Sequence, residues 1–218
     1  GSHLSVLAHL RPAAVIKSSF YRPHPRSTYA RWAAATPAGF RFCVKLPRSI
    51  THDARLKDST ALLQTFLEQA IGLGDRLGCL LVQLPPSLAF VESDAEAFFI
   101  SLRRRFPGHV VLEPRHESWV GAEALLVHYH IAQVAVDPSR ISTDSTPRGW
   151  PGLKYWRLHG SPRIYFSPYE LLCLERLAVE LGDQLKLLSP REVDYIVAEN
   201  GKTKIVTRSD AYPSNDTL

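Results

Sequence analysis

The amino-acid sequence predicts an α/β fold, namely a TIM-type (β/α) barrel that is incomplete, with about seven parallel strands. Short apolar runs alternate with helical patterns along almost all of the 218 residues. Short connections between such elements indicate parallel strands joined by right-handed crossovers. In addition, five consecutive strands carry polar residues at or just past their carboxyl ends. TIM-barrel enzymes place their active sites at those ends.

Each predicted strand is a short run of apolar residues bounded by turn residues. The predicted strands are 13–18, 39–46, 78–84, 109–113, 131–137, 153–158 and 193–197. The competing architecture is an open doubly wound sheet. That architecture is disfavoured because no glycine-rich turn of the dinucleotide-binding kind follows a strand, and Gly72-Leu73-Gly74 precedes one instead.

The predicted helices show apolar residues at helical spacing. They are 58–74, 93–105, 118–130 and 168–181. Asp58 or Ser59 is the expected N-cap of the first helix. The second begins with Ser93-Asp94-Ala95-Glu96, which is the pattern of a capping box. The buried face of the first helix is predicted to contain Leu62, Leu63, Phe66, Leu67 and Ala70.

The chain is predicted to form one domain, because no linker rich in glycine or serine and no internal repeat divides it. Residues 1–3 resemble a tag remnant, 4–197 form the barrel domain, and 198–218 form a polar tail. No apolar run approaches the roughly 20 residues that span a bilayer, so no membrane association is expected. The three cysteines show no CxxC spacing, which is typical of reduced thiols. These features favour a cytoplasmic protein.

Side chains on a strand alternate between its two faces, and this alternation predicts a polar mouth at one end of the barrel. The most apolar residues of each strand, such as Phe42 and Val44, are assigned to one face. Polar residues occupy the other face at the strand ends, and the following loops add more. The strand-end residues are Lys45, Gln83, Glu113, Arg115, Asp137, Arg157 and His159, and the loop residues are His52, His116, Trp119 and Tyr165.

These residue types indicate a site for a small anionic ligand that bears phosphate or carboxylate. Arginine offers a two-pronged donor to such groups, and lysine offers a mobile point charge. We therefore expect Arg115, Arg157 and Lys45 to hold the anion. The ligand-binding set also includes His52, Gln83, Trp119 and Tyr165.

The same cluster would support catalysis, with a hydrolase as the favoured reaction class. In that case Glu113 or Asp137 would act as general base, and His159 or His116 as general acid. No metal site is predicted, because neither an HExxH motif nor a closely spaced histidine pair is present. Convergence of ligands from separate strands stays open, and the cofactor, if any, is unknown.

Two alternatives stay open. The polar residues could form a purely structural network of ion pairs, in which Arg157 pairs with Asp137 and Lys45 pairs with Glu113. Alternatively, the protein could be a non-catalytic nucleic-acid-binding or interaction module, in which Trp119, Tyr165 and Tyr169 stack on bases. A nucleic acid is the less favoured partner, because a net charge of +5 over 218 residues does not require one.

The chain resembles the YecE-like family, known as domain of unknown function 72. The matching segments include SSFYRPHPRSTYARWAAATPAGFRFCVKLPRSITHDARL, LGDRLGCLLVQLPPSLAF, VVLEPRHESW and YWRLHGS. The resemblance implies a TIM-barrel-type fold and a pocket, but no established activity. Carried over by position, it points to Phe20, Tyr21, Lys45, His52, Gln83, Glu113, Arg115, His116, Trp119, Arg157, His159 and Gly160.

The chain departs from the family pattern at both ends. The first strand, with its Gly-x-Ser-Gly-Trp-like segment, is missing. Val15-Ile16-Lys17 stands where the family has Glu-x-Asn, and 198–218 is unlike the usual ending. The resemblance therefore implies a copy truncated at the N-terminus and divergent at the C-terminus. A missing strand would expose two edges, which favours a homo-oligomer, and a degenerate barrel without activity is a third interpretation.

Overall fold

The computed structural model describes residues 8, 13–139, 141, 146–160 and 169, together with the backbone of 193–199 and 202–207. The first of its two sheets has the order β1-β2-β3-β4-β5-β7. Its strands are β1 (Ala13–Ile16), β2 (Arg41–Lys45), β3 (Leu77–Gln83), β4 (His109–Glu113), β5 (Ile131–Gln133) and β7 (Arg148–Gly149). Strands β1 to β5 are parallel, whereas β7 pairs antiparallel with β5.

The second sheet has the order β10-β9-β8-β6. Its strands are β6 (Ala135–Asp137), β8 (Lys154–Leu158), β9 (Val193–Glu199) and β10 (Lys202–Thr207). Strand β6 runs parallel to β8, but β9 runs antiparallel to β8 and to β10. The prediction that 193–197 continues a parallel series is therefore wrong. The predicted tail 198–218 begins inside β9 and contains β10, and its other residues lie outside the described part of the chain.

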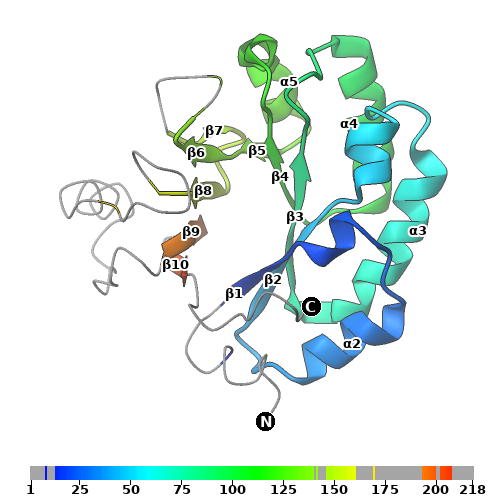
Figure 1. The fold of residues 1–218 in the computed structure, drawn as a ribbon, viewed down its shortest axis with the longest axis vertical. Helices are drawn as coiled ribbons and strands as arrows, with labels where there is room; N and C mark the ends of the chain where they lie inside the picture. The colour runs from blue at the N-terminus through cyan, green and yellow to red at the C-terminus, as the bar shows by residue number, and fades with distance from the viewer. Residues whose placement is uncertain are drawn as a thin grey trace.

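The helices lie on one side of strands β1 to β5 (Figure 1). They are α2 (Arg26–Ala34), α3 (Thr60–Ala70), α4 (Glu92–Arg105) and α5 (Glu123–His128), with short helical turns η1 (Ser18–Phe20), η2 (Ser49–Asp53), η3 (Ile71–Arg76) and η4 (Glu117–Ala122). Among the described helices, none is both long and apolar enough to cross a bilayer. The predicted helix 168–181 lies outside the described residues.

Helix α2 was not predicted, and the predicted start of α4 is wrong, whereas the predicted N-cap position of α3 is confirmed. Helix α2 buries only Tyr29, so its sequence lacks the apolar periodicity that reveals a helix. Ser59 is the N-cap residue of α3, but its Oγ donates to the carbonyl of Leu56 instead of capping the helix. Helix α4 begins at Glu92 without a side-chain cap, so the predicted capping box does not form.

The two faces of the first sheet carry different cores. The face toward the helices holds the larger cluster, which includes Phe42, Val44 and Leu112. The opposite, inner face holds a smaller cluster that includes Cys43, Cys79, Leu81, Val111, Ala132, Val134 and Tyr155. The predicted alternation is therefore confirmed for β2 and β4. Cys43 and Cys79 are buried free thiols.

The alternation predicted for 131–137 holds, but its two faces are reversed, and the structure divides the segment between β5 and β6. Ala132 is in register with Val111, and Val136 is in register with Arg157. Val134 and Val136 therefore face the inner cluster. Asp137 is in register with Leu158, on the other side. The two valines were predicted to face the helices because they are apolar, but the inner face has an apolar layer of its own.

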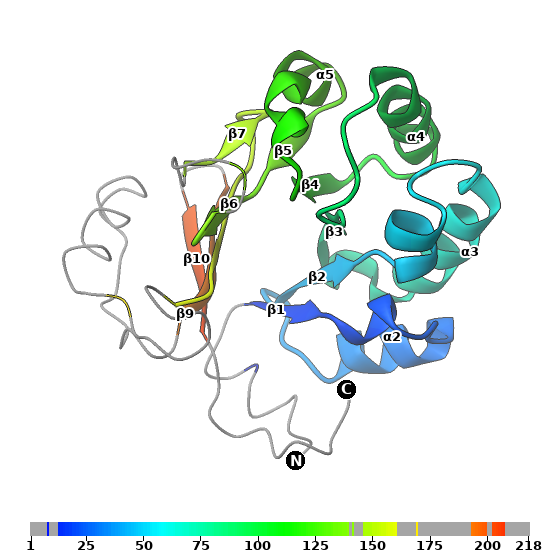
Figure 2. The ribbon, with the colours of Figure 1, turned by 45° about the horizontal axis from the view of Figure 1, so that its top comes forward.

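The two sheets are not joined into a ring within the described residues. Strands β1 to β5 follow a curved arc with the helices on its outer side (Figure 2). Strand β10 lies close to β1, but no hydrogen-bonded pairing between them is present among the described strands. The fold is thus a mixed α/β fold with a mostly parallel sheet, and closure into a TIM-type barrel stays a prediction.

Helix α3 provides a test of the packing on the helix-facing core. Leu63 is fully buried, whereas the adjacent Leu62, which was predicted to be buried, is 44% exposed. We expect Leu63→Ala to lower the free energy of unfolding by about 2–5 kcal/mol, because it leaves a cavity. Leu62→Ala is the matched control and should change it by less than about 0.5 kcal/mol. Urea unfolding followed by circular dichroism measures both, and equal losses would contradict this packing.

Candidate functional site

The candidate site is organised around the carboxylate of Glu113, which is 1% exposed at the carboxyl end of β4. Its Oε2 accepts a hydrogen bond from Nη1 of Arg157 in β8. Its Oε1 accepts from Nε2 of Gln83 at 2.7 Å and from Nε of Arg115 at 3.1 Å. Both carboxylate oxygens are therefore engaged, and two guanidinium groups share one negative charge.

Gln83 connects this carboxylate to Lys45. The side chains of Gln83 and Glu113 lie together because the two residues are register partners in neighbouring strands. The Gln83 amide nitrogen donates to Glu113, so its oxygen Oε1 is left to accept from Nζ of Lys45, at 2.7 Å. The same Nζ lies 3.6 Å from the ring centroid of Phe20, a cation–π contact.

The loop residues around Lys45 complete this corner of the site. His52 packs edge-on against Phe20, with ring centroids 4.9 Å apart. Ser19 donates from its hydroxyl to the backbone carbonyl of Lys45 at 2.6 Å, which ties η1 to the end of β2. The family resemblance indicated Phe20. Nothing in the sequence pattern pointed to Ser19, because a serine hydroxyl that bonds a distant backbone carbonyl leaves no periodic trace.

The electrostatics of the site follow from this crowding of cations. Burial, followed by the charge of Arg157, lowers the pKa of Lys45 to about 8. Burial alone would raise the pKa of Glu113, but Arg157 and Arg115 overcome that effect and hold it below its ordinary value. Burial also opposes the charge on Arg157, yet Glu113 raises the pKa of that guanidinium. The Glu113–Arg157 pair therefore stays charged.

The histidines of the site are biased toward the neutral form. Burial and the charge of Arg157 lower the pKa of His159 to about 4. Burial, followed by Lys45, lowers the pKa of His52 below its ordinary value. A histidine with a pKa near 4 carries almost no proton to donate at neutral pH. His159 is therefore unsuited to the role of general acid that the sequence suggested.

Several predicted site residues do not join the cluster. Asp137 lies on the opposite face, and its backbone carbonyl accepts from the Tyr169 hydroxyl at 2.9 Å. Trp119 is 1% exposed and donates from its indole to the carbonyl of Leu88, so it belongs to the core. His116 caps η4, where its Nδ1 accepts from the backbone of Ser118. Tyr165 lies outside the described residues.

The ion pairs differ from those of the purely structural network considered for the sequence. Arg157 pairs with Glu113 instead of Asp137, and Lys45 reaches Glu113 only through the amide of Gln83. No group of three His, Cys, Asp or Glu side chains suited to a metal ion occurs in the part of the chain that the structure describes.

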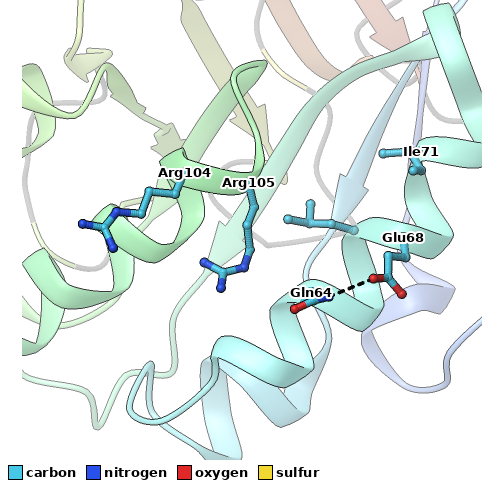
Figure 3. A pocket seen from close by; sticks show the side chains of 6 residues that line it. Gln64, Glu68, Ile71, Arg104 and Arg105 are labelled. Carbon is cyan, nitrogen blue, oxygen red and sulfur yellow. Dashed lines mark hydrogen bonds between the residues drawn. The ribbon is translucent and has the colours of Figure 1, made fainter.

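A separate groove of about 500 Å³ lies between α3 and α4, on the helical side of the sheet. Arg105 projects from α4 toward Gln64 of α3, whereas Arg104 points away from it, and the Gln64 amide donates to Glu68 (Figure 3). None of the predicted site residues lines this groove. Its residues therefore serve as controls for the cluster around Glu113.

Comparisons with known proteins identify the chain's relatives. A family model described as "Protein of unknown function DUF72" matches residues 2–203. The UPF0759 protein YecE is 32% identical over 120 residues in Escherichia coli strain K12 and 40% identical over 120 residues in E. coli O157:H7. Each match covers 54% of this chain but 43% of the relative, so it spans less than half of the relatives' length.

Solved structures of DUF72 family proteins share the fold. A crystal structure from Enterococcus faecalis V583 superposes with a TM-score of 0.68 at 20% identity, covering 80% of this chain and 78% of the other. A crystal structure from Thermotoga maritima MSB8 superposes with a TM-score of 0.57 at 24% identity, covering 80% of this chain and 74% of the other. At these identities the likeness concerns the fold alone.

Replacing Glu113 tests its structural role. We expect Glu113→Gln to lower the free energy of unfolding by about 3–5 kcal/mol, because the buried charge of Arg157 then lacks its counter-charge. The pKa of Glu113 is depressed in the folded state from its ordinary value of 4.5. The contribution of Glu113 is therefore fully present above pH 4.5 and lost as the pH falls through the folded value.

Chemical denaturation from neutral to acidic pH measures this effect. The loss of stability on acidification should be smaller in Glu113→Gln than in the wild type. Glu68→Gln is the control, since Glu68 is exposed on α3 and its replacement should change the stability at neutral pH by less than about 0.5 kcal/mol. An unchanged stability of Glu113→Gln at neutral pH would mean that Arg157 does not depend on this carboxylate.

Proposed function

The chain belongs to the DUF72 family of proteins of unknown function, and we propose that it binds a small anionic ligand at the cluster around Glu113. The ligand bears phosphate or carboxylate. The observation that carries the proposal is the excess of positive charge: Arg157, Arg115 and Lys17 all act on Lys45, while Glu113 is the carboxylate that acts on it. Four cations crowd around one acid, and an anion would relieve their repulsion.

The accessible cations are those that would contact the ligand. Arg115 has 29% of its side chain exposed, and Lys45 is half-buried. Arg157 and Glu113 are buried beneath them and hold them in position. In this proposal Arg115 supplies the planar pair of donors and Lys45 a point charge, while Gln83 fixes the position of Lys45.

Hydrolysis stays the favoured reaction class of this proposal, but Glu113 and His159 take other roles than those predicted from the sequence. A carboxylate that accepts from two guanidinium groups and has a lowered pKa is a weak base, so Glu113 is a positioning residue. His159 is neutral at pH 7 because its pKa is about 4, so in this proposal it accepts a hydrogen bond from the attacking water molecule but is likewise a weak base. We also propose that the two sheets are arcs of one TIM-type barrel, whose carboxyl-terminal mouth would contain this site.

Removing Arg115 tests the anion site directly. We expect Arg115→Ala to abolish measurable sulfate binding while the protein stays folded, because Arg115 is partly exposed and Glu113 keeps Arg157 as a partner. Isothermal titration calorimetry with sulfate measures the affinity. Arg104→Ala, on α4 beside the separate groove, is the matched control and should bind as the wild type does.

Unchanged affinity in Arg115→Ala would remove this residue from the site. Salt dependence distinguishes the alternative of a nucleic-acid-binding module. A surface that contacts many phosphates loses affinity steeply between about 50 and 200 mM salt, whereas a small enclosed anion site loses much less. The burial of Trp119 removes one of the residues that would stack on bases.

The pH dependence of sulfate binding tests the role of Lys45. Sulfate does not titrate near neutrality, so a change in its affinity reports the protein. Because the pKa of Lys45 is about 8, its ammonium is present below pH 8 and lost above it. We expect the affinity to fall as the pH rises through 8. Lys45→Arg keeps its charge throughout, and its affinity should stay level; a parallel fall in both proteins would assign the titration elsewhere.

A further inference from the structure

Lys45 occupies an unusual environment for a lysine. Its Nζ donates to a neutral amide oxygen, that of Gln83, and lies over the apolar ring of Phe20. Within the described residues it makes no ion pair: the nearby carboxylate of Glu113 is taken by Arg157 and Arg115. The ring contact favours the charged ammonium, but burial and the neighbouring cations Arg157, Arg115 and Lys17 outweigh it and favour the uncharged amine.

A lysine in such an environment is a nucleophile near neutral pH. Desolvation and adjacent cations are the two means by which proteins activate lysines for covalent chemistry with carbonyl groups. With a pKa of about 8, about one-tenth of Lys45 is uncharged at pH 7, compared with less than about one-thousandth of an ordinary lysine. Lys45 is partly exposed, so a ligand that reaches Nζ would approach from the solvent side.

We propose that Lys45 forms an imine with an aldehyde or ketone that also carries a phosphate or carboxylate group. This inference rests on the anion site of the proposed function and names its substrate class. An anionic group held by Arg115 would place the carbonyl carbon of a short ligand beside Nζ, and such positioning accelerates addition strongly. Ketose phosphates and 2-oxo acids have this chemistry.

The step balances without an oxidant or a reductant. The lone pair of the uncharged amine adds to the carbonyl carbon, and the carbonyl oxygen takes up a proton to give a carbinolamine. The carbon–oxygen bond then breaks as the carbon–nitrogen double bond forms. The oxygen leaves as water with the two protons that the amine has lost.

Lys57 provides the matched control lysine. It lies after η2, has 61% of its side chain exposed, and pairs with Asp94 at 2.9 Å. Its ammonium faces solvent and a carboxylate, whereas that of Lys45 faces a neutral amide among cations. Lys57 should therefore not react under conditions in which Lys45 does, and replacing it should leave the reaction unchanged.

Borohydride trapping of the full chain tests the inference. The protein is incubated with dihydroxyacetone phosphate near pH 8, reduced with borohydride and examined by peptide mass spectrometry. We expect one reduced adduct, on the peptide that contains Lys45, in the wild type and in Lys57→Arg, and none in Lys45→Arg. Dihydroxyacetone, which lacks the anion, should give at least about tenfold less adduct.

The outcomes separate the two proposals. Sulfate binding without an adduct in the wild type would overturn the imine and leave the anion site standing. Absence of both would overturn both. Adducts spread over Lys57 and other lysines, or equal yields from dihydroxyacetone and its phosphate, would overturn the assignment to an anion-directed Lys45. Because the adduct is located in the wild type, the test does not depend on Lys45→Arg folding.

Discussion

The buried ion pair between Glu113 and Arg157 joins the two halves of this structure. Glu113 ends β4 in the six-stranded sheet, and Arg157 lies in β8 of the four-stranded sheet. Burying either charge alone costs several kcal/mol, because water no longer solvates it. Each residue is therefore tolerated in the interior only when the two sheets bring both together. Removing either partner would leave the other charge buried and unpaired, so the two sheets depend on each other at this point.

The properties of the site follow from the limited capacity of that one carboxylate. Glu113 has two oxygens, and Arg157, Arg115 and Gln83 occupy both. Gln83 must present its amide nitrogen to the carboxylate, so only its oxygen remains for Lys45. Lys45 thus receives a neutral partner where a carboxylate would have stabilised its charge. The reactivity that we infer for Lys45 is a consequence of how the neighbouring arginines share Glu113.

Sequence periodicity predicted the parallel strands β1 to β4 and most of the polar residues at their ends. It succeeded because nearly every residue on the helix-facing side of these strands is apolar. It could not predict which acid Arg157 would pair with, since both Glu113 and Asp137 end apolar runs. The division of 131–137 between two sheets decided that question, and Val134 and Val136 gave no indication of it. Likewise, the antiparallel direction of β9 depends on long-range pairing and leaves no local pattern.

The inner face is built in layers, and in β2 to β4 its polar residues Lys45, Gln83 and Glu113 form one layer at the carboxyl ends of the strands. Along β2 the inward residues are Cys43 and then Lys45, along β3 they are Leu81 and then Gln83, and along β4 they are Val111 and then Glu113. An apolar layer thus lies directly beneath the polar one. It excludes water from below, which strengthens every electrostatic interaction above it. Inward positions recur every second residue. A slip of one residue in β2, β3 or β4 would therefore turn the polar side chain at the end of that strand to the outer face. Strand register is therefore the constraint that places Lys45, Gln83 and Glu113 in one layer.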